Sequence, residues 1–169
     1  MLFFVTGEQN NAEYVISCED AFNTYSNMVW RLALSKTANS VYADDILQEV
    51  FLKFLRKKPK FTSHEHCKAW LIRVTINCSI NLLKSAFIKR RADFDETIAT
   101  QIEEKSEVYL EVLKLPEKQR IAIHLHYYEG YSIDEIATFT KSNPSTVKSW
   151  LHRARKQLKQ QLKGVNFDV

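Results

Sequence analysis

Apolar residues recur every three or four positions over most of this chain, which is the period of helices that bury one face. Three such patterns in the first half predict helices over about residues 20–36, 42–57 and 65–84. Pro59 ends the second helix, because proline cannot continue one. The three apolar faces together predict one small helical core.

The same period resumes near Glu107 and predicts further helices in the second half. We place Pro116 at the first helical position of one of them, where its missing N–H costs nothing. Three glycines and three prolines among 169 residues are too few for a turn-rich β fold. We therefore expect an all-α protein: two small helical domains, residues 1–91 and 108–169, joined by a flexible acidic linker at residues 92–107.

The end of the chain carries the pattern of a helix-turn-helix. Ser132, with Glu135 three residues later, predicts a capping box at the start of a short helix that ends by about Thr140. After a three-residue turn, Pro144 opens a longer helix that runs to about residue 164. A short helix, a tight turn and a longer helix make up this DNA-binding motif.

Charge is distributed in blocks that the net charge of +4 conceals. Residues 1–90 hold 12 basic and 8 acidic side chains, and residues 116–169 hold 9 and 5. Between them, residues 91–115 hold 3 basic and 7 acidic side chains. Two basic modules on either side of an acidic segment suggest a polyanionic partner, although random scatter of charge remains an alternative.

The longer helix of the helix-turn-helix carries six basic residues and no acidic one between positions 144 and 163. A recognition helix reads base edges with its first turns and holds phosphates with later residues. Thr146, Lys148, Ser149, His152 and Arg153 stand where bases would be read. Arg155, Lys156 and Lys159 stand where phosphates would be held. The alternative is a solvated basic helix end.

Several other classes of protein find no support. Residues 1–5 are apolar but lack the basic start and length of a signal peptide, and no stretch is long enough to span a membrane. Three unpatterned cysteines favour a reducing compartment, so we expect a cytoplasmic protein. Phosphate loops, nucleophile elbows and metal-ligand motifs are absent. We expect no enzyme activity, no catalytic residue, no metal, no cofactor and no small-molecule substrate.

One short cluster keeps a metal-dependent enzyme open as an alternative. His64, Glu65, His66 and Cys67 are consecutive, and histidine and cysteine are zinc ligands. Ligands so close in sequence do not complete a tetrahedron without distant partners. A polar loop before a helix is the simpler interpretation.

Motifs in both halves resemble bacterial sigma factors, from about residue 21 to residue 162. The C-terminal likeness lies in residues 115–120, 128–132, 135–137, 146–149 and 151–155. In the N-terminal half, residues 44–51 resemble the polymerase-binding helix of that family, and residues 69–71 with Arg73 and Asn77 resemble its promoter-melting helix. With only these two domains and a short linker, the chain resembles the extracytoplasmic-function (ECF) group.

The resemblance implies a promoter-specificity subunit of RNA polymerase. Its C-terminal helix would read the upstream minus-thirty-five element, and its N-terminal domain would bind the clamp helices of the largest polymerase subunit. The polymerase-binding residues would be Asp45, Gln48, Glu49, Leu52 and Phe54. The minus-ten element would be held by Asn77, Asn81, Lys84, Lys89 and Arg90, with Arg91 in the same basic tail. An anti-sigma factor, at the membrane or in solution, is a further implied partner, and the active protein would be associated with the nucleoid.

This sequence departs from the family in three places. Lys141 stands where a glycine is usual in the helix-turn-helix turn, and Ser142 where an apolar residue is usual. Trp150 stands where an arginine is common, and it could pack on DNA or on a partner protein. A stand-alone helix-turn-helix regulator, dimeric on a two-fold site, is the main alternative function.

Overall fold

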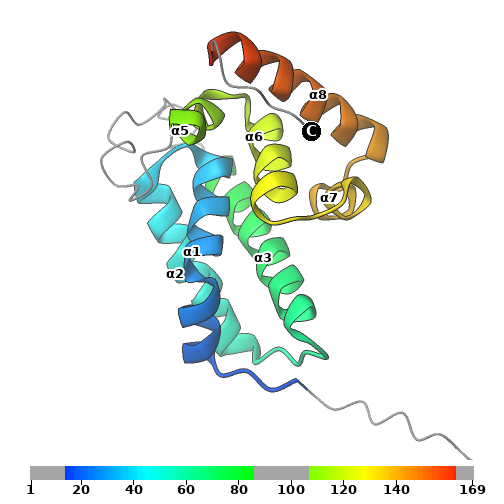
Figure 1. Cartoon of the computed structure of the whole chain (residues 1–169). Helices are drawn as coiled ribbons and strands as arrows, with labels where there is room; N and C mark the ends of the chain where they lie inside the picture. The colour runs from blue at the N-terminus through cyan, green and yellow to red at the C-terminus, as the bar shows by residue number, and fades with distance from the viewer. Residues whose placement is uncertain (1–13, 86–106, 163–169) are drawn as a thin grey trace, which may run out of the picture.

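The computed structural model describes residues 14–85 and 107–162, and all the regular elements in these two ranges are helices (Figure 1). Within these ranges, Tyr14 and Phe61 also form an isolated antiparallel β-bridge. The all-α expectation is confirmed. Lys89, Arg90, Arg91, most of the expected linker and both chain ends lie outside the described residues.

Three long helices form the first half: α1 (Cys18–Thr37), α2 (Ser40–Lys57) and α3 (His64–Lys84). A side-chain oxygen accepts a backbone N–H at the start of each, from Ser17, Asn39 and Ser63. Such caps satisfy N–H groups that have no partner inside the helix. The helices predicted over residues 20–36, 42–57 and 65–84 agree with these spans to within about two residues.

The second half consists of shorter elements before one long helix. They are α5 (Glu107–Lys114), α6 (Glu117–Ile123), the π-helical turn η1 (His124–Tyr128), α7 (Ile133–Thr140) and α8 (Pro144–Gln161). Pro116 is the cap of α6 rather than its first residue, because its ψ of 143° is extended. The π turn was not predicted. It closes with the Glu129 N–H donating to the His124 carbonyl and the Tyr131 N–H to the Leu125 carbonyl.

The helix-turn-helix forms as predicted, including its capping box. Ser132 and Glu135 exchange side-chain and backbone hydrogen bonds at the start of α7. The turn bends without glycine, since Lys141 itself adopts the left-handed conformation with φ of 53°. The Ser142 N–H then donates to the Ala137 carbonyl at 2.9 Å and closes the helix end.

Buried side chains fall into two apolar clusters, and each contains residues from both halves of the chain. Tyr109 and Leu113 of α5 join the cluster formed by α1, α2 and α3. Leu32, Ile72 and Ile76 join the cluster of the C-terminal helices. Figure 1 shows the consequence: α6 lies between α8 and the long helices of the first half. The two-domain division remains a prediction, and in this structure the two halves share their cores.

Candidate nucleic-acid and partner interfaces

Six of the seven predicted upstream-element residues on α8 are exposed: Lys148, Ser149, His152, Arg153, Arg155 and Lys156. Thr146 is half-buried, and Lys159 is exposed one turn beyond Lys156. The opposite face of α8 is buried through Val147, Leu151, Ala154 and Leu158. Because the apolar stripe fixes the rotation of the helix, its cationic face points to solvent. This geometry suits insertion into a major groove.

Two contacts on α8 limit what its side chains offer to DNA. The Ser149 hydroxyl donates to the Ser145 carbonyl at 3.0 Å, so its lone pairs remain as acceptors. Arg155 donates to the Tyr127 hydroxyl at 3.3 Å, which steers its guanidinium toward η1. Arg155 therefore lies at the flank of the recognition face, where a phosphate contact is the natural role.

On α3, Asn77, Asn81 and Lys84 are all exposed. Their spacing of four and three residues places them on one side of the helix. The neighbouring side holds Ile72 and Ile76, which face the C-terminal helices. The structure thus brings together the three described members of the predicted minus-ten set.

On α2, Asp45, Gln48 and Leu52 are exposed, and Glu49 is half-buried beside Lys53, with 3.6 Å between their charged atoms. Phe54 does not fit the predicted role. Only 5% of its surface is exposed, and its ring packs edge-on to Trp70 at 5.7 Å between centroids. Phe54 faces the first core because it continues the buried stripe of Val50 and Phe51. It is a core residue rather than a partner contact.

Two apolar residues extend the exposed face of α2 and were missed in the sequence. Val41 is 60% exposed and Leu55 is 54% exposed, beside Leu52 at 43%. With Asp45 and Gln48 they form a single stripe at spacings of four, three, four and three residues. We call this set the α2 stripe: Val41, Asp45, Gln48, Leu52 and Leu55. A helical-wheel comparison with the buried residues would have revealed it.

The histidine and cysteine cluster at the start of α3 is dispersed over separate contacts. The Tyr25 hydroxyl lies 2.8 Å from Nδ1 of His64. Nδ1 of His66 accepts from the Thr62 N–H at 3.3 Å. Cys67 is buried, and burial raises its pKa to about 11. Within residues 14–85 and 107–162, no three His, Cys, Asp or Glu side chains gather closely enough to hold a metal ion.

The helices of that same part of the chain are too short or too polar to cross a bilayer. None of them combines the length and the apolar character that membrane spanning requires.

The fold and these surfaces define a helical protein with a helix-turn-helix, a cationic recognition helix and a second exposed face that is partly apolar. Family models narrow the class: residues 21–87 match "Sigma-70 region 2" and residues 105–158 match "Sigma-70, region 4". Both models describe regions of sigma-70 factors. The two matched ranges follow each other in the order expected from the motifs.

Curated relatives carry the same description. RNA polymerase sigma factor SigV of Bacillus subtilis is 32% identical over 139 residues, covering 79% of this chain and 83% of its own length. ECF RNA polymerase sigma factor SigW of the same organism is 24% identical over 170 residues, covering 86% and 89%. This chain belongs to the sigma-70 family of bacterial RNA polymerase sigma factors, in the ECF group.

Solved structures agree with the fold. The sigma factor RpoE of Bartonella quintana, in complex with the anti-sigma factor NepR, superposes with a TM-score of 0.68 at 20% identity. The match covers 88% of this chain and 98% of that one. CnrH, in complex with the cytosolic domain of CnrY, gives a TM-score of 0.59 at 19% identity, covering 88% and 89%.

Proposed function

We propose that this sigma factor acts as a monomer that docks on core RNA polymerase through α2 and reads the two promoter elements with α3 and α8. The observation that carries this proposal is the coexistence, in one chain, of an exposed amide-rich face on α3, an exposed cationic face on α8 and an exposed apolar stripe on α2. Two unequal DNA-facing surfaces suit an asymmetric site. The chain itself would perform no chemistry.

The α2 stripe is the proposed polymerase contact. Val41, Leu52 and Leu55 expose large apolar side chains on a helix whose other face is fully packed. An apolar row flanked by Asp45 and Gln48 suits a partner helix with apolar and basic or polar residues, such as the clamp helices of the largest polymerase subunit. Glu49 would contribute at the edge, since Lys53 already lies beside it.

The two DNA-facing helices would divide the promoter between them. Asn77 and Asn81 offer amides that can hydrogen-bond to bases of the opened minus-ten element, and Lys84 offers a phosphate contact. Lys89 and Arg90 would extend the phosphate contacts. The minus-thirty-five element would be read by Thr146, Lys148, Ser149, His152 and Arg153 of α8, with Arg155 and Lys156 on phosphates.

The decisive experiment is co-purification of the full chain with bacterial core polymerase, followed by transcription from selected promoters. We expect a stable complex that initiates. Leu52→Lys with Leu55→Lys should weaken the complex about thirtyfold, as expected when an apolar anchor worth about 2 kcal/mol is removed. Lys148→Ala with Arg153→Ala is the matched control on the distant surface and should leave polymerase binding unchanged. Failure of the unmodified chain to bind at low salt would refute the proposal.

The stand-alone regulator remains the competing function, and the α2 stripe argues against it. A repressor that needs only its helix-turn-helix has no use for three exposed apolar residues on α2. It would instead bind duplex DNA tightly without polymerase, as a dimer on a two-fold site. Analytical ultracentrifugation with duplex DNA separates the two cases.

Location and regulation complete the proposed function. We place the protein in the cytoplasm, on the nucleoid when it is active. RpoE was captured with the anti-sigma factor NepR, and CnrH with the cytosolic domain of CnrY. We propose that an anti-sigma factor also binds this chain. Such a partner could hold the chain at the membrane. Affinity capture of the chain from its own cells, with and without stress, tests for it.

A further inference from the structure

The two flanks of α8 differ in what they offer to a partner. On one flank Trp150 is half-buried, and its ring packs against the apolar cluster that the two halves of the chain share. Together with Ile76 and Ile80 of α3 it lines a cavity of about 60 Å³. Trp150 therefore faces the first half of the chain rather than the DNA-reading face. The other flank carries Arg155 and looks toward η1.

Arg155 carries a positive charge that no carboxylate balances in the part of the chain that the structure describes. The polar contact found for it there is the hydrogen bond that Nη1 donates to the Tyr127 hydroxyl, at 3.3 Å. Its own helix offers no acidic residue. A guanidinium has five N–H donors, so four of them remain. The guanidinium is thus held in one direction and still offers donors to an anion.

The Tyr127 hydroxyl is the second half of this pair. It accepts from Arg155 and keeps its own proton, since a phenol is a donor as well as an acceptor. The edge of the His126 ring packs against Tyr127, with 4.9 Å between ring centres. Nδ1 of His126 in turn donates to the Tyr131 carbonyl at 2.9 Å. Tyr127 can therefore donate to the same anion as Arg155, from a supported position.

The π turn brings Tyr127 to the surface. The turn closes through the Glu129 N–H, which donates to the His124 carbonyl five residues back. After this wider turn Tyr127 and Tyr128 both emerge, at 40% and 41% exposure. Their rings differ in position, because Tyr128 packs against Tyr109 and His124. π turns inside helical segments are frequent at functional sites.

Apolar side chains lie beside the pair. Val108, Ile123 and Leu158 help to line a cavity of about 140 Å³ that Tyr127 and Arg155 also border. Such a wall offers no competing hydrogen-bond acceptor, and it lowers the local dielectric. A charge contact next to it is stronger than the same contact in open water.

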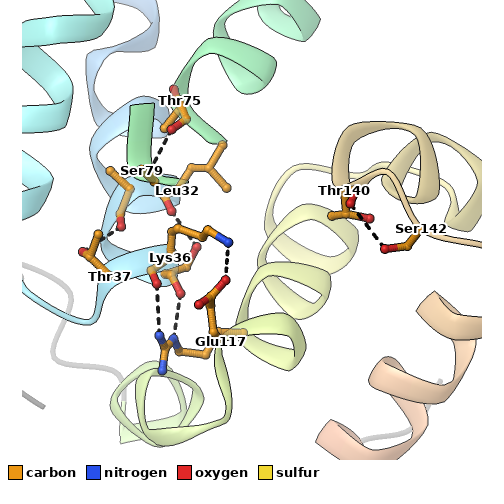
Figure 2. A network of polar contacts seen from close by, with 11 residues as sticks. Leu32, Lys36, Thr37, Thr75, Ser79, Glu117, Thr140 and Ser142 are labelled. Carbon is orange, nitrogen blue, oxygen red and sulfur yellow. Dashed lines mark hydrogen bonds and ion pairs between the residues drawn. The ribbon is translucent and has the colours of Figure 1, made fainter. Parts of the chain in front are cut away.

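The rotation of α8 joins this pair to the DNA-reading face. Before α8 begins, the Ser142 hydroxyl donates to the Thr140 carbonyl at 3.3 Å within the turn, as Figure 2 shows. Along the helix, Arg155 comes three residues after His152 and four before Lys159. These spacings place all three on one side of the helix, and all three are exposed. The pair therefore continues a row that begins among the predicted base-reading residues.

The geometry points to a binding site for one backbone phosphate of the upstream element, in which Tyr127 of η1 and Arg155 of α8 donate to the same phosphate. The inference rests on the proposed function and adds to it a DNA contact outside α8. A phosphate carries the negative charge that Arg155 lacks, and it can accept from both donors at once. The hydrogen bond between the two side chains fixes the guanidinium beforehand, so less freedom is lost on binding. Such a contact sets the register of α8 without reading sequence.

A scan of the upstream duplex with single methylphosphonates tests the site. Each substitution neutralises one phosphate and leaves every base unchanged. The full chain in complex with core polymerase should have one position at which this neutralisation weakens binding about tenfold. At that position, Tyr127→Phe with Arg155→Gln should lose less than about twofold, because the contact is already gone. If every phosphate that matters to the unmodified chain matters equally to this double variant, the inference is overturned.

Single variants separate the two donors. Tyr127→Phe removes only the hydroxyl and should weaken binding about fivefold on every upstream sequence. The slope of log K against log salt should stay unchanged, because no charge is lost. Arg155→Gln should weaken binding about tenfold and make that slope shallower by about 0.9. The double variant should lose less than the product of the two effects, since the donors share one phosphate.

Tyr128→Phe is the matched control, because it removes a hydroxyl from the neighbouring tyrosine of equal exposure. It should leave binding of the upstream duplex unchanged, and thermal unfolding should show the same midpoint for both tyrosine variants. Equal weakening by Tyr128→Phe, or strictly additive effects of Tyr127→Phe and Arg155→Gln, would overturn the inference.

The outcomes also separate the inference from the function on which it rests. If the unmodified chain forms no polymerase complex that binds the upstream duplex, the proposed function fails and takes the inference with it. If that complex binds and Tyr127→Phe binds equally tightly, the inference alone is overturned.

Discussion

The helices α3 and α8 are both proposed to contact DNA, but their exposed faces are suited to different forms of it. α8 carries five lysines or arginines and no acidic residue. The proposed DNA face of α3 instead carries two asparagines and one lysine, Asn77, Asn81 and Lys84. A cationic helix gains most from the phosphates of a closed duplex, whereas amides gain from base edges freed by strand opening. On the proposed assignment, the two surfaces would serve two stages of promoter recognition.

The two regions also differ in how they are supported. α3 has 21 residues and packs with two other long helices, whereas α8 rests on elements of 8, 7, 5 and 8 residues. Helices this short are unstable alone and need tertiary contacts. Such contacts come from the Ser35 carbonyl, which accepts from Arg120, and from the first-half members of the shared apolar cluster. The C-terminal region, which carries the cationic helix α8, therefore depends more on its neighbour than the N-terminal region does.

Removing charge from α8 should give the largest effect. Lys148→Ala with Arg153→Ala is expected to weaken upstream-duplex binding about a hundredfold, since each specific contact contributes about 1–3 kcal/mol. The slope of log K against log salt should become shallower by about 0.9 for each phosphate that is no longer neutralised. Fluorescence anisotropy over a salt series measures both. The control Arg56→Ala with Lys57→Ala removes equal charge from α2, and an equal weakening there would mean that net charge alone drives binding.

Removing the amides of α3 should give a smaller effect, and it should weaken binding to single-stranded DNA rather than to the duplex. Asn77→Ala with Asn81→Ala is expected to weaken binding of the polymerase complex to single-stranded minus-ten DNA about thirtyfold, at roughly 1 kcal/mol for each of two hydrogen bonds removed. Upstream-duplex binding and its salt slope should stay unchanged. Both oligonucleotides can be titrated against the same preparation. Equal weakening on both would show that α3 and α8 are not specialised as proposed.

Local rules were sufficient for much of this architecture. The helix spans, the capping box of Ser132 and Glu135, and the exposed cationic face of α8 all follow from residue spacing over one or two turns. An amphipathic helix fixes its own rotation once the buried stripe is known. The recognition helix was therefore predictable in detail, although its DNA contacts remain predictions.

Features set by distant contacts were not predictable in this way. Phe54 follows the spacing of the buried residues Val50 and Phe51, but the sequence does not show that Phe61 and Trp70 pack against it. Arg120 lies inside a family motif, but its hydrogen bonds to the end of α1 join residues 84 and 85 positions apart. The π turn at His124–Tyr128 has no known local signature. Such features depend on which helices meet, and periodicity does not encode that.

Lowering the pH should weaken the ion pair between Lys68 of α3 and Glu129, which joins the two regions. Burial opposes ionisation of Glu129, yet contacts from His124 and Lys68 hold the pKa of its carboxyl below the ordinary 4.5 in the folded chain. The Glu129 carboxyl of the unfolded chain therefore binds a proton more readily than that of the folded chain. The stability that the ionised carboxylate contributes is complete above pH 4.5, and it is lost as the pH falls through the lower pKa of the folded chain. We expect Glu129→Gln to remove about 1 kcal/mol near neutral pH, as for a partly exposed pair. The free energy of unfolding of this variant should then fall less steeply below pH 4.5 than that of the unmodified chain.

Urea unfolding at several pH values measures this effect. Lys68→Met is the companion variant, because it keeps the carboxyl and removes its partner across the interface. Both variants should flatten the acid limb of the stability curve. If Glu129→Gln kept the slope of the unmodified chain, the coupling assigned to this pair would be wrong.

The smallest expected effect asks whether the two regions unfold together. Lys141 ends α7 and Lys58 ends α2, and both hold a positive φ, 53° and 43°. Replacing either with glycine relieves left-handed strain of about 1–2 kcal/mol and costs unfolded-state entropy, for a net gain of about 0.5 kcal/mol. That corresponds to a Tm increase of about 1–2 °C. Alanine at either position keeps the Cβ and should give no gain.

If the shared core couples the regions, Lys141→Gly and Lys58→Gly will each shift the same single transition. Two transitions, each moved by only one glycine, would contradict that coupling.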